Sequence, residues 1–308
     1  MIFVEPSCEI IKDSHTIESA LENIEQAARV CYASTKKSYN LEDNKKFLFN
    51  LFQKHHYRPF EFGTIYYTIP LKNIFLSPNY SEEQYIKNKI SSSPWTKKVE
   101  VEGPVYCTTN CRVILEVIVE LYKDLTKEEL FDKFWTLIHS IYEYYPDYHK
   151  DRTTILWKIS RGVADEFRTH TQISSLMQST RYCNYSSDKF DNRIRICRPQ
   201  WMNQSANQLN DMISNNEDFS DPVYNLFLAS WGMSEAVYNE LIKDYGVPAE
   251  QARGVLPLDL YTEFIQCGFD DDWENFFNQR YFGTTGKPHP DAKYIASQAY
   301  YKWKGVTE

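Results

Sequence analysis

The sequence lacks several features that would place it in common functional classes. Glycine contributes only 10 of its 308 residues, and no apolar run approaches the roughly 18 residues of a membrane span. Positive charge is also scarce, because 34 lysines and arginines stand against 42 acidic residues and give a net charge of −8. A broad nucleic-acid surface needs many cations. We therefore expect no nucleic-acid or membrane partner, while a small anionic ligand would need only a few arginines.

The seven cysteines form no recognisable framework. Their number is odd, and Cys107 and Cys111 have no matching Cys or His pair nearby. Free thiols therefore fit better than disulfides or a zinc site. The first 15 residues contain neither a basic segment nor a long apolar run, so we expect no secretory signal. These features together predict a soluble, cytoplasmic protein.

Motifs for the commonest hydrolytic and phosphoryl-transfer reactions are missing as well. The sequence contains no Walker loop, no G-x-G-x-x-G, no G-x-S-x-G and no H-E-x-x-H. Aromatic residues, in contrast, are abundant: 23 tyrosines and 18 phenylalanines bring the aromatic content to 16% with tryptophan. This composition excludes a disordered chain, and the length allows a large buried core.

Hydrophobic periodicity predicts mainly helices. Apolar residues recur at helical spacing over residues 13–31, 43–56, 126–144, 229–244, 273–281 and 288–303. Asp13 or Ser14 is the expected cap of the first helix, and Thr126 of the third. Residues 62–70 are rich in aromatic and β-branched types and predict a strand. The apolar run 112–122 leaves helix and strand open.

We predict a single domain over residues 1–308, of the α+β class because helices dominate over a few strands. Residues 71–105 are polar and predict a surface insertion. Residues 184–220 are rich in Asn, Asp and Ser and predict a long loop with short structured pieces. No internal repeat is present.

One pair of polar residues suggests a phosphate site. Ser179 and Arg181 are two residues apart, and a hydroxyl with a guanidinium fork can donate three hydrogen bonds to one phosphate. A lone surface arginine more often pairs with an acidic side chain. The argument for a ligand site therefore depends on other motifs in the chain.

Those motifs resemble, in the same order, the motifs of the flavin-dependent thymidylate synthases. Ala252–Thr262 is similar to that family's A-R-x-V-L-P-x-x-x-x-T, and Asn275–Arg280 to its N-F-x-x-x-R. His56–Glu61 resembles the start of H-x-x-P-F-E-H, and Cys31-Tyr32 also fits. Thr169–Tyr182 resembles an Arg-His-Arg triplet followed seven residues later by Ser-x-Arg-Tyr, with threonine in place of both triplet arginines.

The resemblance implies an α+β fold with a twisted, mainly antiparallel sheet and helices. It also implies a homotetramer with active sites between subunits. The implied reaction is reductive methylation at C5 of a pyrimidine deoxynucleotide monophosphate, dUMP to dTMP. Methylene-tetrahydrofolate supplies the carbon, and NADPH supplies electrons through FAD. No protein nucleophile is needed for this chemistry, which agrees with the absence of a convincing Cys–His pair.

The resemblance also assigns roles by position. Four residues are expected to bind the nucleotide: Ser179, Arg181, Arg253 and Arg280. Four others are expected to line the flavin cofactor site: His56, Glu61, His170 and Asn275. Arg280 is in addition the expected catalytic residue, because a fixed cation can stabilise charge that develops on the uracil carbonyl.

The departures from the family pattern fall mostly on the flavin side. Thr169 and Thr171 carry no charge, and losing two charge-assisted hydrogen bonds should weaken FAD binding by ~2–4 kcal/mol, at ~1–2 kcal/mol each. Arg168 is adjacent, but a shift of one residue turns a helical side chain by about 100°. Three further positions hold residues that the family does not usually have: Phe62, Met177 and Thr284.

Three functional interpretations follow. The first is a flavin-dependent thymidylate synthase-like enzyme that acts on dUMP. The second is a divergent relative with weak or no flavin binding, in which water replaces hydride and the product is a 5-hydroxymethyl pyrimidine nucleotide. The third is a non-catalytic nucleotide-binding homologue. The presence of both Arg253 and Arg280 argues against the third, because a purely structural relative has little need of them.

Overall fold

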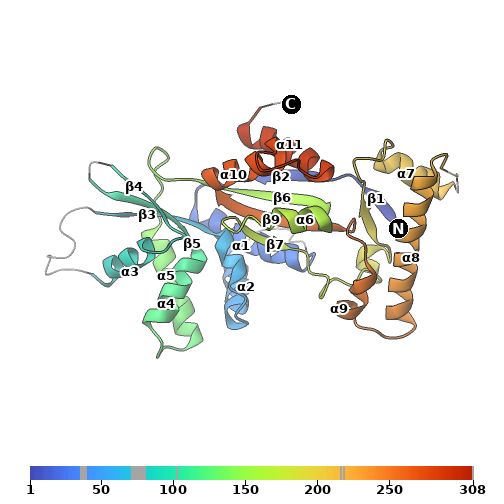
Figure 1. The fold of residues 1–308 in the computed structure, drawn as a ribbon. Helices are drawn as coiled ribbons and strands as arrows, with labels where there is room; N and C mark the ends of the chain where they lie inside the picture. Colours follow the sequence, from blue (N-terminus) through green and yellow to red (C-terminus); the bar gives the residue numbers. More distant parts are fainter. Residues whose placement is uncertain (35–39, 71–80, 102, 216, 218, 307–308) are drawn as a thin grey trace.

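The computed structural model describes residues 1–34, 40–70, 81–101, 103–215, 217 and 219–306. Its centre is a four-stranded antiparallel sheet in the order β2-β6-β9-β7 (Figure 1). These strands are β2 (Ser7–Ile11), β6 (Arg152–Ser160), β7 (Ser174–Met177) and β9 (Tyr261–Phe269). The sheet joins segments that lie far apart in the sequence.

One face of the central sheet is covered by helices from the second half of the chain. They are α6 (Arg161–Phe167), α10 (Asp270–Phe277) and α11 (Pro290–Lys304). Trp157 of β6 packs with Trp273 and Phe276 of α10 in a buried aromatic cluster. Burying side chains of this size is the main favourable contribution to packing these helices on the sheet. The short π-helical turn η4 (Asn278–Phe282) follows α10 and ends at Gly283.

The opposite face of the sheet contacts α1 (Ile17–Cys31). Ala27 and Val30 of this helix pack on Ile265 and Cys267 of β9. The small alanine side chain allows the helix to lie close to the sheet. The C-terminal end of α1 therefore lies beside β7 and the turn that follows it, in the segment where the nucleotide residues were predicted.

A second sheet with its own helices forms one end of the molecule, at the left of Figure 1. It has the order β3-β5-β4, with β3 (Thr64–Ile69), β4 (Lys97–Glu100) and β5 (Val105–Asn110). The surrounding helices are α2 (Leu41–Gln53), α3 (Glu82–Ser91), α4 (Cys111–Leu121) and α5 (Lys127–Ile141). Together they bury one large apolar cluster. The 3-10 turn η1 (Arg58–Phe62) connects α2 to β3.

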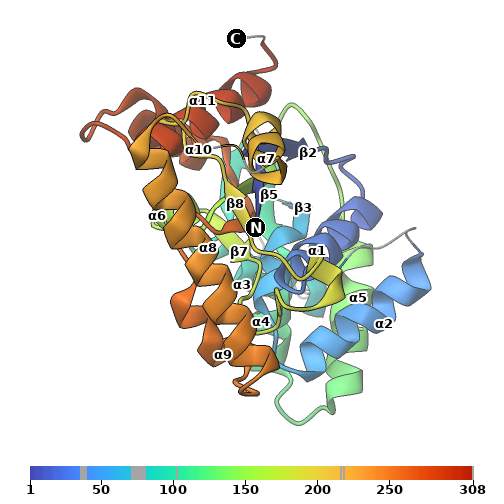
Figure 2. The same ribbon diagram turned by 90° about the vertical axis from the view of Figure 1, so that its right-hand side faces the viewer.

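The other end of the molecule is built around a long helix, seen at the front of Figure 2. This helix is α8 (Pro222–Lys243), and it packs with α7 (Ala206–Ser214) and the parallel pair β1 (Ile2–Val4) and β8 (Arg195–Cys197). The remaining short turns are η2 (Asp188–Phe190), α9 (Ala249–Ala252) and η3 (Arg253–Val255). No helix in the described part of the chain is long and apolar enough to cross a membrane.

The predicted α+β class with mainly antiparallel sheets is confirmed. All six predicted helices are present, five of them within a few residues of the predicted bounds, whereas α8 begins at Pro222, well before the predicted residue 229. The ambiguous run 112–122 is helical, as α4. The cap predicted for the first helix was wrong: α1 begins at Ile17, and the Thr16 side chain accepts from the Ser19 amide. Asp13 and Ser14 lie before the cap, where Asp13 accepts from the Ser19 hydroxyl.

The segment predicted as an insertion lies partly outside the described residues, since residues 71–80 are not described. Its described part contains α3 and β4. Ile86 and Ile90 of α3 are buried in the same apolar cluster as α4 and α5. The predicted loop 184–220 contains η2, β8 and α7, which are short structured pieces. The prediction of a single domain stays a prediction.

Candidate active site

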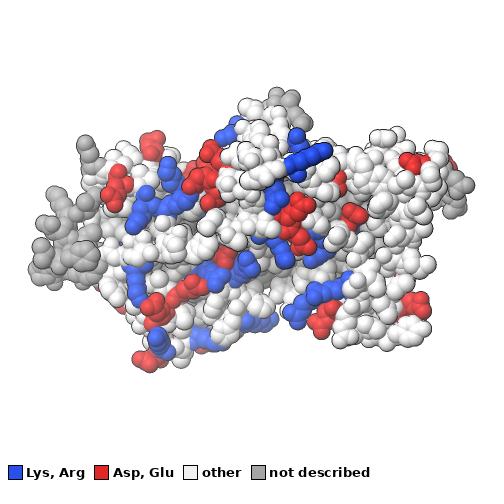
Figure 3. Space-filling model, in the orientation of Figure 1, with Lys and Arg blue, Asp and Glu red and all other residues white. Residues whose placement is uncertain are grey.

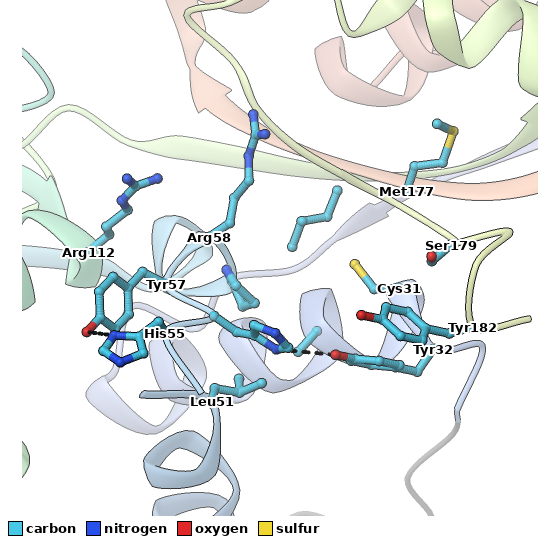
Figure 4. A pocket seen from close by; sticks show the side chains of 14 residues that line it. Cys31, Tyr32, Leu51, His55, Tyr57, Arg58, Arg112, Met177, Ser179 and Tyr182 are labelled. Atoms are coloured by element: carbon cyan, nitrogen blue, oxygen red, sulfur yellow. Dashed lines mark hydrogen bonds between the residues drawn. The ribbon is translucent and has the colours of Figure 1, made fainter. Parts of the chain in front are cut away.

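Two neighbouring cavities open between α1, η1, α4 and β7, with volumes of about 470 and 390 Å³. Arg58 and Arg112 line both of them. Figure 4 shows the first cavity, with Arg58 and Arg112 on one side and Ser179 and Tyr182 on the other. Volumes of several hundred Å³ are typical of sites for small molecules and cofactors.

Aromatic side chains and one serine line the far end of the first cavity. The hydroxyl of Tyr32 lies 3.3 Å from Nδ1 of His56, and the rings of Tyr32 and Tyr182 are 5.3 Å apart. Cys31 also lines this cavity, and burial followed by the nearby Cys183 thiol raises its pKa to about 11. The thiol is therefore protonated at neutral pH and is a poor nucleophile.

The structure brings together three of the four residues predicted to bind the nucleotide. The amide of Ser179 donates to the carbonyl of Cys31 at 2.9 Å, which fixes the turn to the end of α1. The amide of Arg181 donates to the Ser179 hydroxyl at 3.2 Å. Arg253 comes from a distant part of the sequence, and its guanidinium donates to the hydroxyl of Thr180 at 3.1 Å.

Both arginines of this group are exposed. Arg181 forms one ion pair, in which its Nε donates to Glu250 at 3.3 Å. Glu250 lies in α9, one short turn before Arg253. An exposed ion pair of this kind is weak, so a phosphate could replace the carboxylate at little cost. The two guanidinium groups and the Ser179 hydroxyl thus form a candidate phosphate site beside the first cavity.

Arg280, the fourth predicted nucleotide residue, lies in another place. Its guanidinium donates from Nε to His170 Nε2 at 3.0 Å and from Nη1 to Glu166 at 3.3 Å. Its Nη2 donates to the Glu166 carbonyl and to the Thr169 hydroxyl, both at 2.8 Å. Four of the five N–H groups of a guanidinium are therefore directed at residues 166–170. Arg280 lines neither of the two cavities.

His170 is buried beside Arg280 and packs edge-on against Phe276. Burial, and then the positive charge of Arg280, lower the pKa of His170 to about 4. The ring is therefore neutral at pH 7, and Nε2 accepts the hydrogen bond from Arg280. The Thr169 hydroxyl is also used within the chain, because it donates to the Glu166 carbonyl at 2.7 Å.

Glu61 lines the second cavity together with Thr171 and Ser174. Its carboxylate accepts from Arg112 at 2.5 Å. Its backbone carbonyl accepts from the buried Arg152 at 2.9 Å. The predicted cofactor residues His56 and Glu61 thus lie in adjacent cavities, at the two ends of the loop that contains η1.

The remaining predicted cofactor residue, Asn275, lies apart from these cavities. It is exposed on α10, and its side-chain oxygen accepts from Gln279 at 3.1 Å. The unusual residues differ in their placement. Met177 lines the first cavity, Phe62 is fully buried, and Thr284 donates to the carbonyl of Asn278. Arg168 does not approach the cavities, because it is exposed and paired with Asp165 at 3.2 Å.

Four residues that line the cavities had no role predicted from the sequence. They are Arg58, Trp95, Arg112 and Tyr182. Arg58 lies inside the His56–Glu61 motif, so its position next to a predicted site could have been noticed. Trp95 and Arg112 come from elements whose approach to the site depends on the tertiary fold, and no local pattern indicates it.

The described residues contain no group of three His, Cys, Asp or Glu side chains that could hold a metal ion. All seven cysteines are free thiols, and six of them are buried.

A comparison with known families matches the second half of the chain. The family model described as "thymidylate synthase complementing protein" matches residues 149–306. The chain belongs to this family. The matched range contains Ser179, Arg181, Arg253 and Arg280, together with His170 and Asn275. His56 and Glu61 precede the matched range.

The comparison with curated proteins and the comparison with solved structures gave different results. No curated protein matches its sequence. Among solved structures it is similar to a UMP/dUMP methylase, PolB from Streptomyces cacaoi, bound with 5-Br UMP or with 5-Br dUMP. Both are 12% identical and match over 99% of this chain. The coverage of the two PolB chains is 92% and 93%, and the TM-scores are 0.40 and 0.41, respectively.

Proposed function

We propose that this member of the thymidylate synthase complementing protein family transfers a one-carbon unit to C5 of a pyrimidine deoxynucleotide monophosphate. The proposed reaction converts dUMP to dTMP with methylene-tetrahydrofolate, FAD and NADPH. The observation that carries the proposal is the group formed by Ser179, Arg181 and Arg253 beside the first cavity. Two guanidinium groups and a hydroxyl suit a phosphate monoester.

The rest of the first cavity suits a pyrimidine ring. Tyr32, Tyr182 and Leu176 offer aromatic and apolar surface next to Ser179. A planar base can stack on a tyrosine ring, and such stacking contributes about 1–3 kcal/mol in single-stranded nucleic-acid complexes. We propose that the phosphate lies at Arg181 and Arg253 and that the base points into the cavity.

The family implies a flavin, and the residues on one side of the cavities fit such a planar, anionic group. His56, Glu61 and Thr171 would hold it, with Arg58 near its phosphates. When bound, the flavin would supply hydride for the one-carbon unit. His170 and Asn275 line neither cavity. The four hydrogen bonds of Arg280 show how it positions the 166–170 turn. We propose in addition that Arg280 stabilises the charge that develops on the uracil carbonyl during the reaction.

A second candidate function is supported by a specific observation. The Thr169 hydroxyl and His170 Nε2 are both hydrogen-bonded to Arg280, so the chain offers fewer groups to flavin phosphates than an Arg-His-Arg triplet would. With little bound flavin, water would add to the one-carbon unit in place of hydride. The product would then be a 5-hydroxymethyl nucleotide.

The phosphate site can be tested by comparing two ligands that differ only in the phosphate. Calorimetric titration should show that dUMP binds more tightly than deoxyuridine. Arg181→Met and Arg253→Met should each weaken dUMP binding by about tenfold or more, since a hydrogen bond to a charged group contributes about 1.5–3 kcal/mol. Neither change should alter deoxyuridine binding. Arg193→Met, at an exposed arginine before β8, serves as the matched control.

Product analysis distinguishes the candidate reactions. The protein is incubated with dUMP, methylene-tetrahydrofolate and NADPH, with and without added FAD, and the nucleotides are analysed by mass spectrometry. Formation of dTMP that depends on FAD supports the first function, and a hydroxymethyl product without FAD supports the second. Nucleotide binding without any turnover would indicate a non-catalytic homologue. In the calorimetric titration, equal binding of dUMP and deoxyuridine would exclude the phosphate site.

A further inference from the structure

Trp95 presents a large aromatic surface at the mouth of the second cavity. Its side chain lines that cavity and is 46% exposed. It lies in residues 92–96, which join α3 to β4 and have no predicted function. An exposed indole that lines a cavity offers a planar surface on which an aromatic ligand can stack.

The backbone beneath Trp95 is held firmly. A tight turn closes when the amide of Thr96 donates to the carbonyl of Ser93 at 3.1 Å. The Thr96 hydroxyl is buried, bonds the Ile90 carbonyl at 2.9 Å and lies 2.8 Å from the Thr109 hydroxyl. The indole is thus displayed by an anchored turn. A ligand that stacks on this indole therefore costs the protein little conformational entropy, because the turn is already ordered.

Arg58 provides a positive charge in the same cavity. It is exposed, and its side chain forms no hydrogen bond or ion pair with any residue that the structure describes. Its backbone is fixed because Pro59 and Phe60, which follow it in η1, are buried. Because the described residues offer its guanidinium no hydrogen-bond or ion-pair partner, Arg58 is available to an anionic ligand.

The charges around the second cavity show why Arg58 matters. Arg112 is bonded to both acidic side chains of the cavity, Glu61 at 2.5 Å and Glu116 at 2.7 Å. Two arginines and two glutamates line the cavity, so the total charge is balanced. However, both carboxylates are bonded to Arg112, so among the described residues that line the cavity the Arg58 guanidinium is the charged group that remains available to a ligand.

We propose that Trp95 and Arg58 bind a planar heterocyclic ligand that carries a carboxylate or a phosphate. The ring stacks on the indole, and the anionic group accepts charge-assisted hydrogen bonds from the guanidinium. This assignment rests on the proposed function, which names two ligands of this chemistry: a folate, with carboxylates, and a flavin nucleotide, with phosphates. In either case Arg58 supplies positive charge in the cavity that Thr171 also lines.

The proposal is tested by direct binding, without turnover. Protein freed of bound ligand is titrated with folic acid and, separately, with FMN and FAD, and binding is followed by calorimetry. Trp95→Phe and Arg58→Met should each raise the dissociation constant of the bound ligand by about tenfold. Quenching of protein fluorescence by that ligand should decrease in Trp95→Phe. Circular dichroism checks that both variants are folded.

Matched changes outside the cavity serve as controls. Trp201→Phe replaces another exposed tryptophan at the far end of the molecule, and Arg193→Met replaces another exposed arginine. Both should bind the ligand as the unchanged protein does. If the cavity variants weaken the binding of folic acid alone, the ligand is a carboxylate. If they weaken the binding of FMN and FAD alone, the ligand is a phosphate.

Two results would overturn the proposal: no binding of any of the three ligands, or equal binding by the cavity variants and the controls. The proposed function fails by different measurements, namely the loss of phosphate-dependent dUMP binding or of turnover. A protein that binds a folate or flavin through Trp95 and Arg58 but does not convert dUMP would keep this inference and refute that function.

Discussion

His170 shows how a single residue can change its meaning when its neighbours are known. In the sequence it is the surviving centre of a triplet that has lost two arginines. In the structure it is a buried, neutral hydrogen-bond acceptor for Arg280. The low pKa of about 4 follows from burial and from the adjacent guanidinium. The clearest expected effect of this low pKa is on the unfolding free energy of the protein.

The effect of His170 on stability should depend on pH with a defined sign. Its folded-state pKa of about 4 lies below the ordinary value of 6.5. The unfolded state therefore binds more protons between these values, and stability is lost as pH falls from about 6.5 towards 4. His170→Gln keeps an acceptor for Arg280 but does not titrate. It should reduce the loss of unfolding free energy between pH 7.5 and pH 5 by about 2 kcal/mol.

Urea unfolding at the two pH values measures this difference. His139→Gln, at an exposed histidine of α5, should lose as much stability as the unchanged protein. If His170→Gln also behaves like the unchanged protein, the ring is not held neutral by its surroundings, and its assigned contact with Arg280 is wrong.

At the scale of elements, the site depends on where α1 ends. Cys31 and Tyr32 lie at the C-terminal end of this helix, and the Cys31 carbonyl accepts from Ser179. The helix thereby connects the predicted nucleotide turn to the central sheet, on which Ala27 and Val30 pack. Stability of the helix and order in the turn should therefore be related.

The corrected cap of α1 provides a test of this element. Thr16 accepts from the Ser19 amide at 3.1 Å, and replacing an N-cap threonine by alanine costs about 0.5–2 kcal/mol. Thr16→Ala should lower the unfolding free energy by about 1 kcal/mol. Ser14→Ala, at the position first predicted as a cap, should change it by less than about 0.5 kcal/mol, as for ordinary surface changes. Urea unfolding compares the two, and equal losses would contradict the cap assignment.

At the scale of the whole molecule, α8 exposes an unusual apolar surface. Leu226 and Met233 are 72% and 65% exposed, and Val223 and Phe227 lie on the same helix. Glu235, the one charged residue of α8 before Glu240, pairs with the chain's N-terminal amine. Figure 3 shows few charged side chains over this end of the molecule. Apolar patches of this kind often mark interaction surfaces, and the homotetramer that the family resemblance implies would supply a second copy of the chain to cover this one.

Sedimentation velocity can test this role of α8. The unchanged protein should sediment as a tetramer, and the double change Leu226→Glu and Met233→Glu should lower the assembly state, since two charges would be buried without partners. Leu41→Glu, at an exposed leucine of α2, should leave the assembly unchanged. A monomer at all concentrations, or a tetramer that survives the double change, would contradict the prediction.

The sequence by itself determined the α+β class, six helices and the family. Helical periodicity and capping are local properties, so Thr126 was predicted as the cap of α5, and its side chain does accept from Glu129. The cap of the first helix was predicted wrongly because the side chains of Asp13, Ser14 and Thr16 can all act as N-caps. The choice among them depends on where packing against the sheet begins. Motifs that occur in the same order as in the family can likewise be recognised in the sequence without knowledge of the fold.

Only the tertiary structure decided which of the motif residues meet. Arg253 reaches Thr180, whereas Arg280 turns to His170 and Glu166. Arg58 and Trp95 line one cavity although they are 37 positions apart in the chain. These relations depend on strand order and on side-chain partners from distant segments. Local sequence patterns do not encode long-range contacts of this kind, because the same motif can face a ligand or a neighbouring side chain.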